Sequence, residues 1–289
     1  MAIDLVELGS RLETIVLRRL AEDRLVLPAM AGPVGKCMAL LQQSEGTLKQ
    51  VGVLLARDVV ISAQLVRLAS GAAHGSPVRT VEQAVTRLGA QRVRTFLVET
   101  SARKLFDSRA PSIAETARGL WVHSHAVALL ARDVAALCGS AEGETAYLAG
   151  LLHDVGKPIL ASLLLEAERM LAASRPTAPW FKADAWLGAV QGVHRKVGVA
   201  IAERWGLPDA VVAAIRDCND FDSGDRMCAA NFVRFANAVA KDKGLCVGPV
   251  DLDDARALVM VGRSMLGVED DVLTRLTNDL AVRAQALEG

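Results

Sequence analysis

The sequence has few aromatic residues and no excess of charge of either sign. Aromatic residues make up 4% of the 289 residues, and the 33 lysines and arginines balance the 33 aspartates and glutamates. Basic residues cluster only in pairs, such as Arg18-Arg19 and Arg195-Lys196. Nucleic acids and anionic membranes bind extended basic surfaces, so this balance supports neither partner. We expect the protein to bind no nucleic acid and no membrane.

Cysteine is scarce, and long hydrophobic runs are missing. The five cysteines lie far apart and form no Cys-x-x-Cys pair, which argues against a structural zinc site or a redox motif. The apolar stretch 158–165 is well short of the roughly 20 residues that span a bilayer. Asp4 and Glu7 stand where a secretory signal would be basic and then apolar. We therefore predict a cytoplasmic protein with reduced thiols.

The apolar residues recur at intervals of three and four, which predicts an all-α protein. Hydrophobic residues make up 52% and charged residues 23% of the chain, so there is enough apolar surface for a packed core. A first helical block extends to about residue 110, with helices over 80–88 and 91–104 at its end. A second block begins near residue 111. Its helices, and those that follow it, are expected over 113–137, 143–152, 159–173, 183–205, 209–216, 226–241, 251–266 and 269–287.

Four of the five histidines fall in the second block, and this clustering is the main chemical signal. His153 and Asp154 are adjacent at a predicted helix end, and His123 and His194 lie on the apolar faces of two other predicted helices. Three helices could therefore bring three imidazoles and one carboxylate to one point. His125 lies about 200° around the helix from His123, so we expect it to be exposed and outside the cluster.

The residues alone leave two interpretations of this cluster open. Two histidines and one carboxylate suit a divalent metal such as Fe, Mn or Zn, which could activate water for attack on a phosphate ester. The alternative is a set of buried histidines that donate hydrogen bonds to carbonyls. Lys157 either contacts a phosphate or is a solvated residue at a helix end.

Several segments together resemble the HD superfamily, and its HDOD branch fits best. The segments that carry the resemblance are Leu27-Pro28-Ala29-Met30, Val81 to Val85 with Leu88-Gly89, His123-Ser124, His153-Asp154-Val155-Gly156-Lys157, and His194 with Trp205-Gly206-Leu207-Pro208. The sequence departs from the family pattern at Asp58-Val59 and Ser70-Gly71.

The resemblance implies a two-lobed helical fold. Residues 1–24 would form an N-terminal helix, and residues 25–240 the HDOD domain. This domain would divide into an N-terminal helical lobe, 25–110, and an HD-like lobe, 111–240. Residues 241–289 would form extra C-terminal helices that pack on the HD-like lobe.

The resemblance also implies a bacterial signal-transduction output module that acts by protein–protein interaction without catalytic turnover and has a degenerate HD metal site. Its partners would be other signalling proteins, with a homodimer as an alternative. Catalytic HD relatives complete their metal site with a late aspartate, and Asn237 stands at the matching position. The extra histidine pair and Gly-Tyr-Pro segment of the HD-GYP phosphodiesterases are absent from the sequence. A metal-dependent phosphohydrolase or phosphodiesterase that uses His123, His153, Asp154 and His194 is the alternative function.

Overall fold

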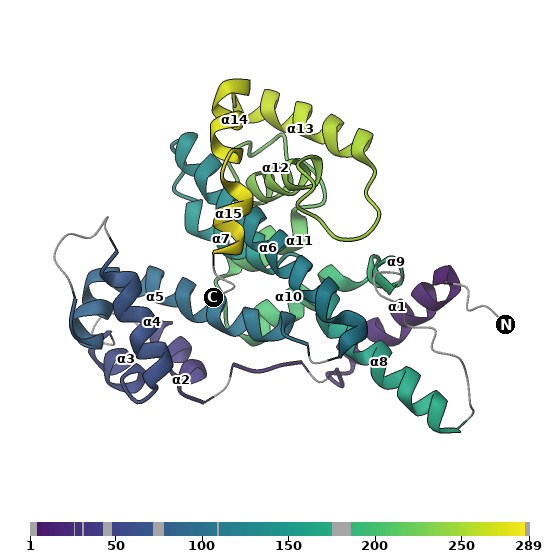
Figure 1. The fold of residues 1–289 in the computed structure, drawn as a ribbon, viewed down its shortest axis with the longest axis horizontal. Helices are drawn as coiled ribbons and strands as arrows, with labels where there is room; N and C mark the ends of the chain where they lie inside the picture. The colour runs from purple at the N-terminus through teal and green to yellow at the C-terminus, as the bar shows by residue number, and fades with distance from the viewer. Residues whose placement is uncertain are drawn as a thin grey trace. The chain divides into compact units, whose positions relative to one another are not determined.

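A computed structural model describes residues 5–25, 27–30, 32–42, 48–71, 78–108, 110–174 and 186–286 (Figure 1). Within these ranges the regular structure is helical and contains no strand, which confirms the all-α prediction. The helices are α1 (Leu5–Ala21), α2 (Gly32–Leu41), α3 (Leu48–Leu55), α4 (Val59–Ala69), α5 (Val81–Phe106), α6 (Pro111–Leu137), α7 (Gly143–Leu152), α8 (Gly156–Ser174), α9 (Trp186–Val190), α10 (His194–Arg204), α11 (Asp209–Asp217), α12 (Ala229–Asp242), α13 (Leu252–Leu266), α14 (Asp270–Thr277) and α15 (Leu280–Gln285).

The chain divides into two compact units. The smaller unit contains residues 27–101 and 203–207, and the larger unit contains 1–26, 102–202 and 208–289. The opening helix and the C-terminal helices thus belong to the larger unit, and one boundary between the units along the chain falls inside α5. The end of α5 belongs to the larger unit because it packs on α6, where the Phe106 and Trp121 rings lie 5.6 Å apart.

Local sequence features fix the helices of the smaller unit. The Asp58 carboxylate accepts from the backbone N–H groups of Val60 and Ile61, both at 3.0 Å, and so caps α4. Gly89 interrupts α5 with φ 73° and ψ 170°, a conformation open mainly to glycine, which explains the two separate helices that the sequence predicts here. The short segment 203–207 joins this unit because the Trp205 indole N–H donates to the Pro28 carbonyl at 2.8 Å.

The core of the larger unit is the pair α6 and α7, against which α12 packs. Seven of the ten residues of α7 are buried, from Ala146 to Leu152. At Gly150 a Cβ atom would stand 2.9 Å from the Cα of Ala128, so the missing side chain lets α7 approach the backbone of α6. This close crossing places the residues that follow α7 beside the middle of α6.

The C-terminal helices lie on this core: α13 packs on α12, and α15 packs on α6 (Figure 1). The prediction that His125 is exposed was wrong. Its side chain is 3% exposed, and its Nδ1 shares a hydrogen bond with the Ala284 carbonyl at 3.0 Å. Helix α15 covers the face of α6 that helical periodicity alone assigns to solvent, and an ion pair of 2.7 Å between Arg283 and Asp133 holds it there.

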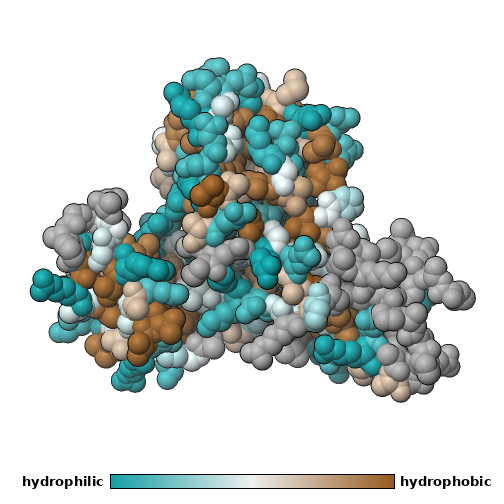
Figure 2. All heavy atoms as spheres, viewed as in Figure 1, coloured by the Kyte–Doolittle hydropathy of each residue, from teal (hydrophilic) through white to brown (hydrophobic). Residues whose placement is uncertain are grey.

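Among the residues that the structure describes, one stretch, Gly143–Met170, is long and apolar enough to cross a membrane, and 78% of its apolar 18-residue window is buried inside the fold, as is common for core helices. On the face seen in Figure 2, hydrophilic residues alternate with apolar patches. Exposed apolar side chains include Val59 and Val60 on α4 and Met260 and Val261 on α13. Single apolar residues at a protein surface are ordinary.

Candidate metal centre

Three helical segments of the larger unit bring the predicted histidines together. His123 lies in the middle of α6, His153 and Asp154 follow the last residue of α7, and His194 is the first residue of α10. All four side chains are buried, with His123 at 4%, His153 at 1%, Asp154 at 3% and His194 at 2% exposed. The sequence-based prediction that these four residues share one location agrees with their placement.

Backbone carbonyls orient the three imidazole rings. The Nδ1 atom of His123 lies 2.6 Å from the Leu245 carbonyl oxygen, that of His153 lies 2.7 Å from the Gly150 oxygen, and that of His194 lies 2.9 Å from the Gln191 oxygen. A carbonyl oxygen can only accept, so Nδ1 carries the proton in each ring. In the neutral rings every Nε2 atom therefore presents a lone pair.

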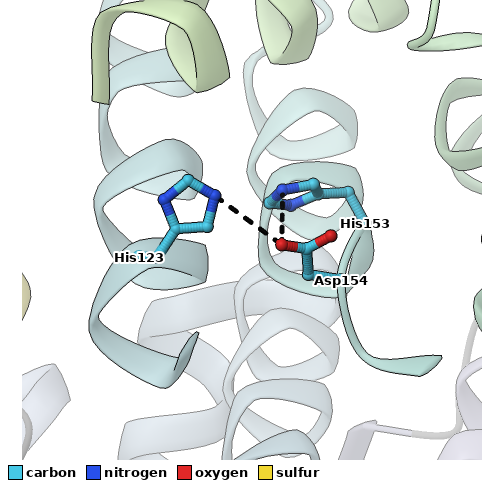
Figure 3. A group of neighbouring side chains, drawn as sticks. All are labelled: His123, His153 and Asp154. Carbon is cyan, nitrogen blue, oxygen red and sulfur yellow. Dashed lines mark ion pairs between the residues drawn. The ribbon is translucent and has the colours of Figure 1, made fainter. Parts of the chain in front are cut away.

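The three Nε2 atoms point at the carboxylate of Asp154. His153 and His123 lie 3.5 and 3.7 Å from its Oδ2 atom, and Figure 3 shows these two contacts. His194 lies 3.2 Å from Oδ1. Lys157, in the first turn of α8, donates to Oδ2 at 2.7 Å. The ligand atoms of His123, His153 and Asp154 all lie within 4.8 Å of one another.

Burial and charge set the protonation of this cluster. Burial lowers the pKa of His153 to about 3, and it also lowers the pKa of His123, although the Asp154 charge opposes both shifts. Burial alone would raise the pKa of Asp154, but His153, Lys157 and His194 together hold this pKa well below its usual range. At neutral pH, His123 and His153 are therefore neutral imidazoles beside an ionised Asp154.

A positive centre between the Nε2 lone pairs and the carboxylate would stabilise this arrangement further than Lys157 alone, which donates to Oδ2 only. Within the described part of the chain, the buried Nε2 atoms of His153 and His194 have no hydrogen-bond partner, which is costly unless another group satisfies them. Imidazole nitrogens together with a carboxylate oxygen are ligands for Fe(II), Mn or Zn. The residues therefore fit a divalent metal, which His123, His153, Asp154 and His194 would hold.

Asn237 stands at the position where, by the resemblance to the HD superfamily, catalytic relatives have the late aspartate of their metal site. It lies on α12, which packs against both α6 and α7. Its Oδ1 atom is buried and, among the residues that the structure describes, accepts no hydrogen bond. A neutral amide oxygen is available here where catalytic relatives would offer an anion, and its role as a ligand stays a prediction.

The sequence analysis did not associate two basic residues, Arg195 and Lys241, with Asp154. Arg195 follows His194 directly, and its charge lowers the pKa of His153. Lys241 lies one helical turn after Asn237, and its own pKa, lowered first by burial, also responds to Asp154 and Lys157. The sequence places Arg195 next to His194 and Lys241 four residues after Asn237. Lysine and arginine are too common at protein surfaces for this spacing to indicate a site.

Comparisons with known proteins show the family and the fold of the chain. Residues 27–221 match the model of the HDOD domain. A crystal structure from Shewanella amazonensis SB2B, named "Putative metal-dependent phosphohydrolase", is 22% identical with a TM-score of 0.69, over 96% of this chain and 99% of that one. An HDOD domain protein of unknown function from Geobacter sulfurreducens is 21% identical with a TM-score of 0.63, over 96% and 98% of the two chains.

Two further relatives are longer than this chain. A crystal structure from Marinobacter aquaeolei VT8, named "Putative signal transduction protein", is 20% identical with a TM-score of 0.63, over 99% of this chain and 65% of that one. An uncharacterized protein of Treponema pallidum is 24% identical over 195 residues, which are 66% of this chain and 37% of that protein. The chain thus spans little more than a third of this curated relative. At these identities the structural matches establish the fold.

Proposed function

We propose that this chain, which belongs to the HDOD domain family, is a regulatory output module of bacterial signal transduction that binds other proteins and does not turn over a substrate. The observation that carries the proposal is the closure of its metal-ligand cluster. None of the four side chains is more than 4% exposed. A phosphate ester must reach a metal ion to be hydrolysed, and a buried ligand set suits a structural role better than such an encounter.

The charge of the ligand set supports the same proposal. Asp154 is the one carboxylate in the cluster, and Lys157 already pairs with it at 2.7 Å. Asn237 adds an amide where a second carboxylate would strengthen the attraction for a divalent ion. A bound metal would supply a coordinated water of lowered pKa and a Lewis acid, and both depend on a firmly held ion. We infer a metal that stabilises the fold, of the class Fe, Mn or Zn.

Partners and location complete the proposal. The five cysteines are free thiols, which fits the reducing cytoplasm. The name of the Marinobacter relative supports a role in signalling. We propose other signalling proteins as partners, with a second copy of this chain as the alternative.

Two measurements on untagged protein purified without chelators test the proposal. The first is elemental metal content, compared with that of the Asp154→Ala variant. The second is hydrolysis of bis-p-nitrophenyl phosphate and of cyclic dinucleotides. We expect no turnover with or without added Fe, Mn or Zn. Turnover that both His153→Ala and Asp154→Ala abolish would overturn the proposal.

The second candidate is a metal-dependent phosphohydrolase, and a specific observation favours it. The three Nε2 atoms converge on Asp154, and Lys157 lies beside them at 14% side-chain exposure, within reach of a group that enters the site. In this function Lys157 would bind the phosphate. One equivalent of metal together with turnover would support it, whereas a protein that neither contains metal nor can be loaded with it would exclude it.

A further inference from the structure

An apolar patch surrounds the turn between α3 and α4 in the smaller unit. Val53 lies in the last turn of α3, and Val59 and Val60 begin α4. All three side chains are more than half exposed, with Val59 at 82%. The turn is tight, because the Asp58 backbone N–H donates to the Leu55 carbonyl at 3.0 Å. We call the three valines the α3–α4 patch, and exposed apolar groups of this kind mark candidate interaction surfaces.

The surroundings of the α3–α4 patch are basic. Lys49, Arg57 and Arg67 are exposed on the same two helices and their turn. The one acidic residue of the stretch 48–69 is Asp58, whose carboxylate accepts from backbone N–H groups that begin α4. The smaller unit as a whole has nine lysines and arginines against five aspartates and glutamates. Because the complete chain is neutral, the larger unit carries the matching excess of negative charge.

A second apolar patch lies on α13, in the larger unit. One side of this helix packs on α12. On the side that faces solvent, Leu252, Met260 and Val261 are exposed, with Met260 at 71%. Ala257 lies between Met260 and Val261 on the helix circumference and is exposed as well. We call these four residues the α13 patch.

Acidic residues border the α13 patch. Asp251, Asp253 and Asp254 are exposed at the start of the helix, and the stretch 251–277 carries six acidic side chains against three arginines. All three arginines already form ion pairs with aspartates of the same chain. The charge around the α13 patch is thus opposite in sign to the charge around the α3–α4 patch.

We propose that the α3–α4 patch of one copy of this chain docks on the α13 patch of a second copy. The contact removes apolar side chains of both copies from water, and the opposite charges around the two patches orient the encounter. The occupant is a second copy because the chain itself carries both halves of the complementary pair. Each copy contributes a different patch, so the contact is head-to-tail and leads to a closed ring or a chain of copies. The proposal goes beyond the regulatory role, because it holds with or without turnover at the metal-ligand cluster.

The test is sedimentation equilibrium of the full chain at concentrations up to about 200 μM, because affinities of modest interfaces extend into the micromolar range. Val59→Asp places an acid in the α3–α4 patch, at a helix start where a carboxylate is favourable. Met260→Lys places a cation in the α13 patch. Each new charge has the same sign as the charge around the opposing patch. Val282→Asp and Met170→Lys are the matched controls, since these side chains are 70% and 69% exposed and lie outside both patches.

An equal mixture of the two patch variants is the decisive sample. The Val59→Asp protein keeps its α13 patch, and the Met260→Lys protein keeps its α3–α4 patch. Each variant alone therefore lacks one half of the contact, whereas the mixture contains one complete contact. Far-UV circular dichroism checks the fold of every protein. If either variant does not fold, Val60→Asp or Val261→Lys takes its place, because these neighbours are exposed too.

We expect the average mass of the wild type to rise with concentration above the 30.7 kDa of one copy. Each patch variant alone should associate at least tenfold more weakly, whereas the two control variants should stay within about twofold of the wild type. The mixture should form a one-to-one pair. Salt at 1 M should weaken the association of the wild type, because it screens the charges around the patches.

Three results would overturn the proposal. The first is a wild type that stays monomeric, which would leave the two patches to another protein. The second is an equal loss of association in the control variants. The third is a mixture that stays as monomeric as its two components, because each patch would then pair with its own counterpart.

Failure of this proposal is distinguishable from failure of the proposed function. Turnover that depends on His153 and Asp154 in a protein that self-associates would overturn the regulatory role and leave the contact intact. A monomeric protein without turnover would overturn the contact alone.

Discussion

Gly156 should tolerate no side chain, because the first turn of α8 lies directly on the backbone of the first residue of α10. A Cβ atom at Gly156 would overlap the carbonyl oxygen of His194 and would stand 2.7 Å from its carbonyl carbon and 3.0 Å from its Cα. Real Cβ contacts essentially never fall below 3.0 Å. The opposing atoms are backbone, so no rotamer change can relieve the overlap, and the two helix starts must separate.

The magnitude follows from the cost of overpacking. Inserting a methyl group into a packed core typically costs about 1–3 kcal/mol, and a rigid backbone neighbour places Gly156→Ala at the upper end. A loss of about 3 kcal/mol in the free energy of unfolding is roughly a 100-fold change in the folding equilibrium. The same displacement would move the His194 ring away from Asp154, to which its Nε2 now lies 3.2 Å from Oδ1.

Urea denaturation followed by circular dichroism measures the loss. Gly188→Ala in α9 is the matched control, because a Cβ atom there meets nothing within 4 Å. Alanine is also favoured over glycine inside a helix by about 0.5–1 kcal/mol, so the control should be neutral or slightly stabilising. The reasoning is refuted if Gly156→Ala unfolds at the same urea concentration as Gly188→Ala.

Three further predictions concern polar groups that are buried or partly buried. Asn231→Ala should lower the free energy of unfolding by about 2–4 kcal/mol, because this amide is fully buried and hydrogen-bonded. Its NH2 group donates to three carbonyls of residues 222–226, and its Oδ1 accepts from the Asp222 N–H at 2.8 Å. An unchanged thermal midpoint would contradict this prediction. Arg283→Met should cost less than about 1 kcal/mol, and 1 M salt should remove most of the difference, because the pair with Asp133 is only partly buried. Burial lowers the pKa of His125 below 6.5, so the unfolded state binds more protons and the free energy of unfolding falls as pH drops below 6.5. His125→Phe should therefore make the free energy of unfolding less dependent on pH between pH 6.5 and 5. An unaltered pH dependence in urea titrations would refute the assignment.

The helices and the cluster could be predicted from the sequence because both depend on local or rare signals. Periodicity locates a helix wherever one face is buried, and the break at Gly89 follows from a residue that permits positive φ. Histidine is rare here, so four in one block already suggested the grouping of His123, His153 and His194. These signals do not require knowledge of which segments meet in space.

The errors and omissions have the opposite origin. His125 was assigned to solvent by its angle from His123, but α15, more than a hundred residues later, covers it. Lys241 and Asn231 look like ordinary polar residues of an amphipathic helix, although the first lies near Asp154 and the second is 0% exposed. Their burial arises from packing of α12 against other helices, which no local pattern encodes.

The C-terminal part of the chain controls the chemistry of a histidine that belongs to the family motif. The match to the HDOD model ends at residue 221, yet the carbonyl that fixes the tautomer of His123 belongs to Leu245. Helix α6 is held again two residues further on, where the Ala284 carbonyl contacts His125. Two faces of α6 thus depend on residues beyond the matched domain: the segment between α12 and α13 orients His123, whose Nε2 lone pair faces Asp154, and α15 contacts His125.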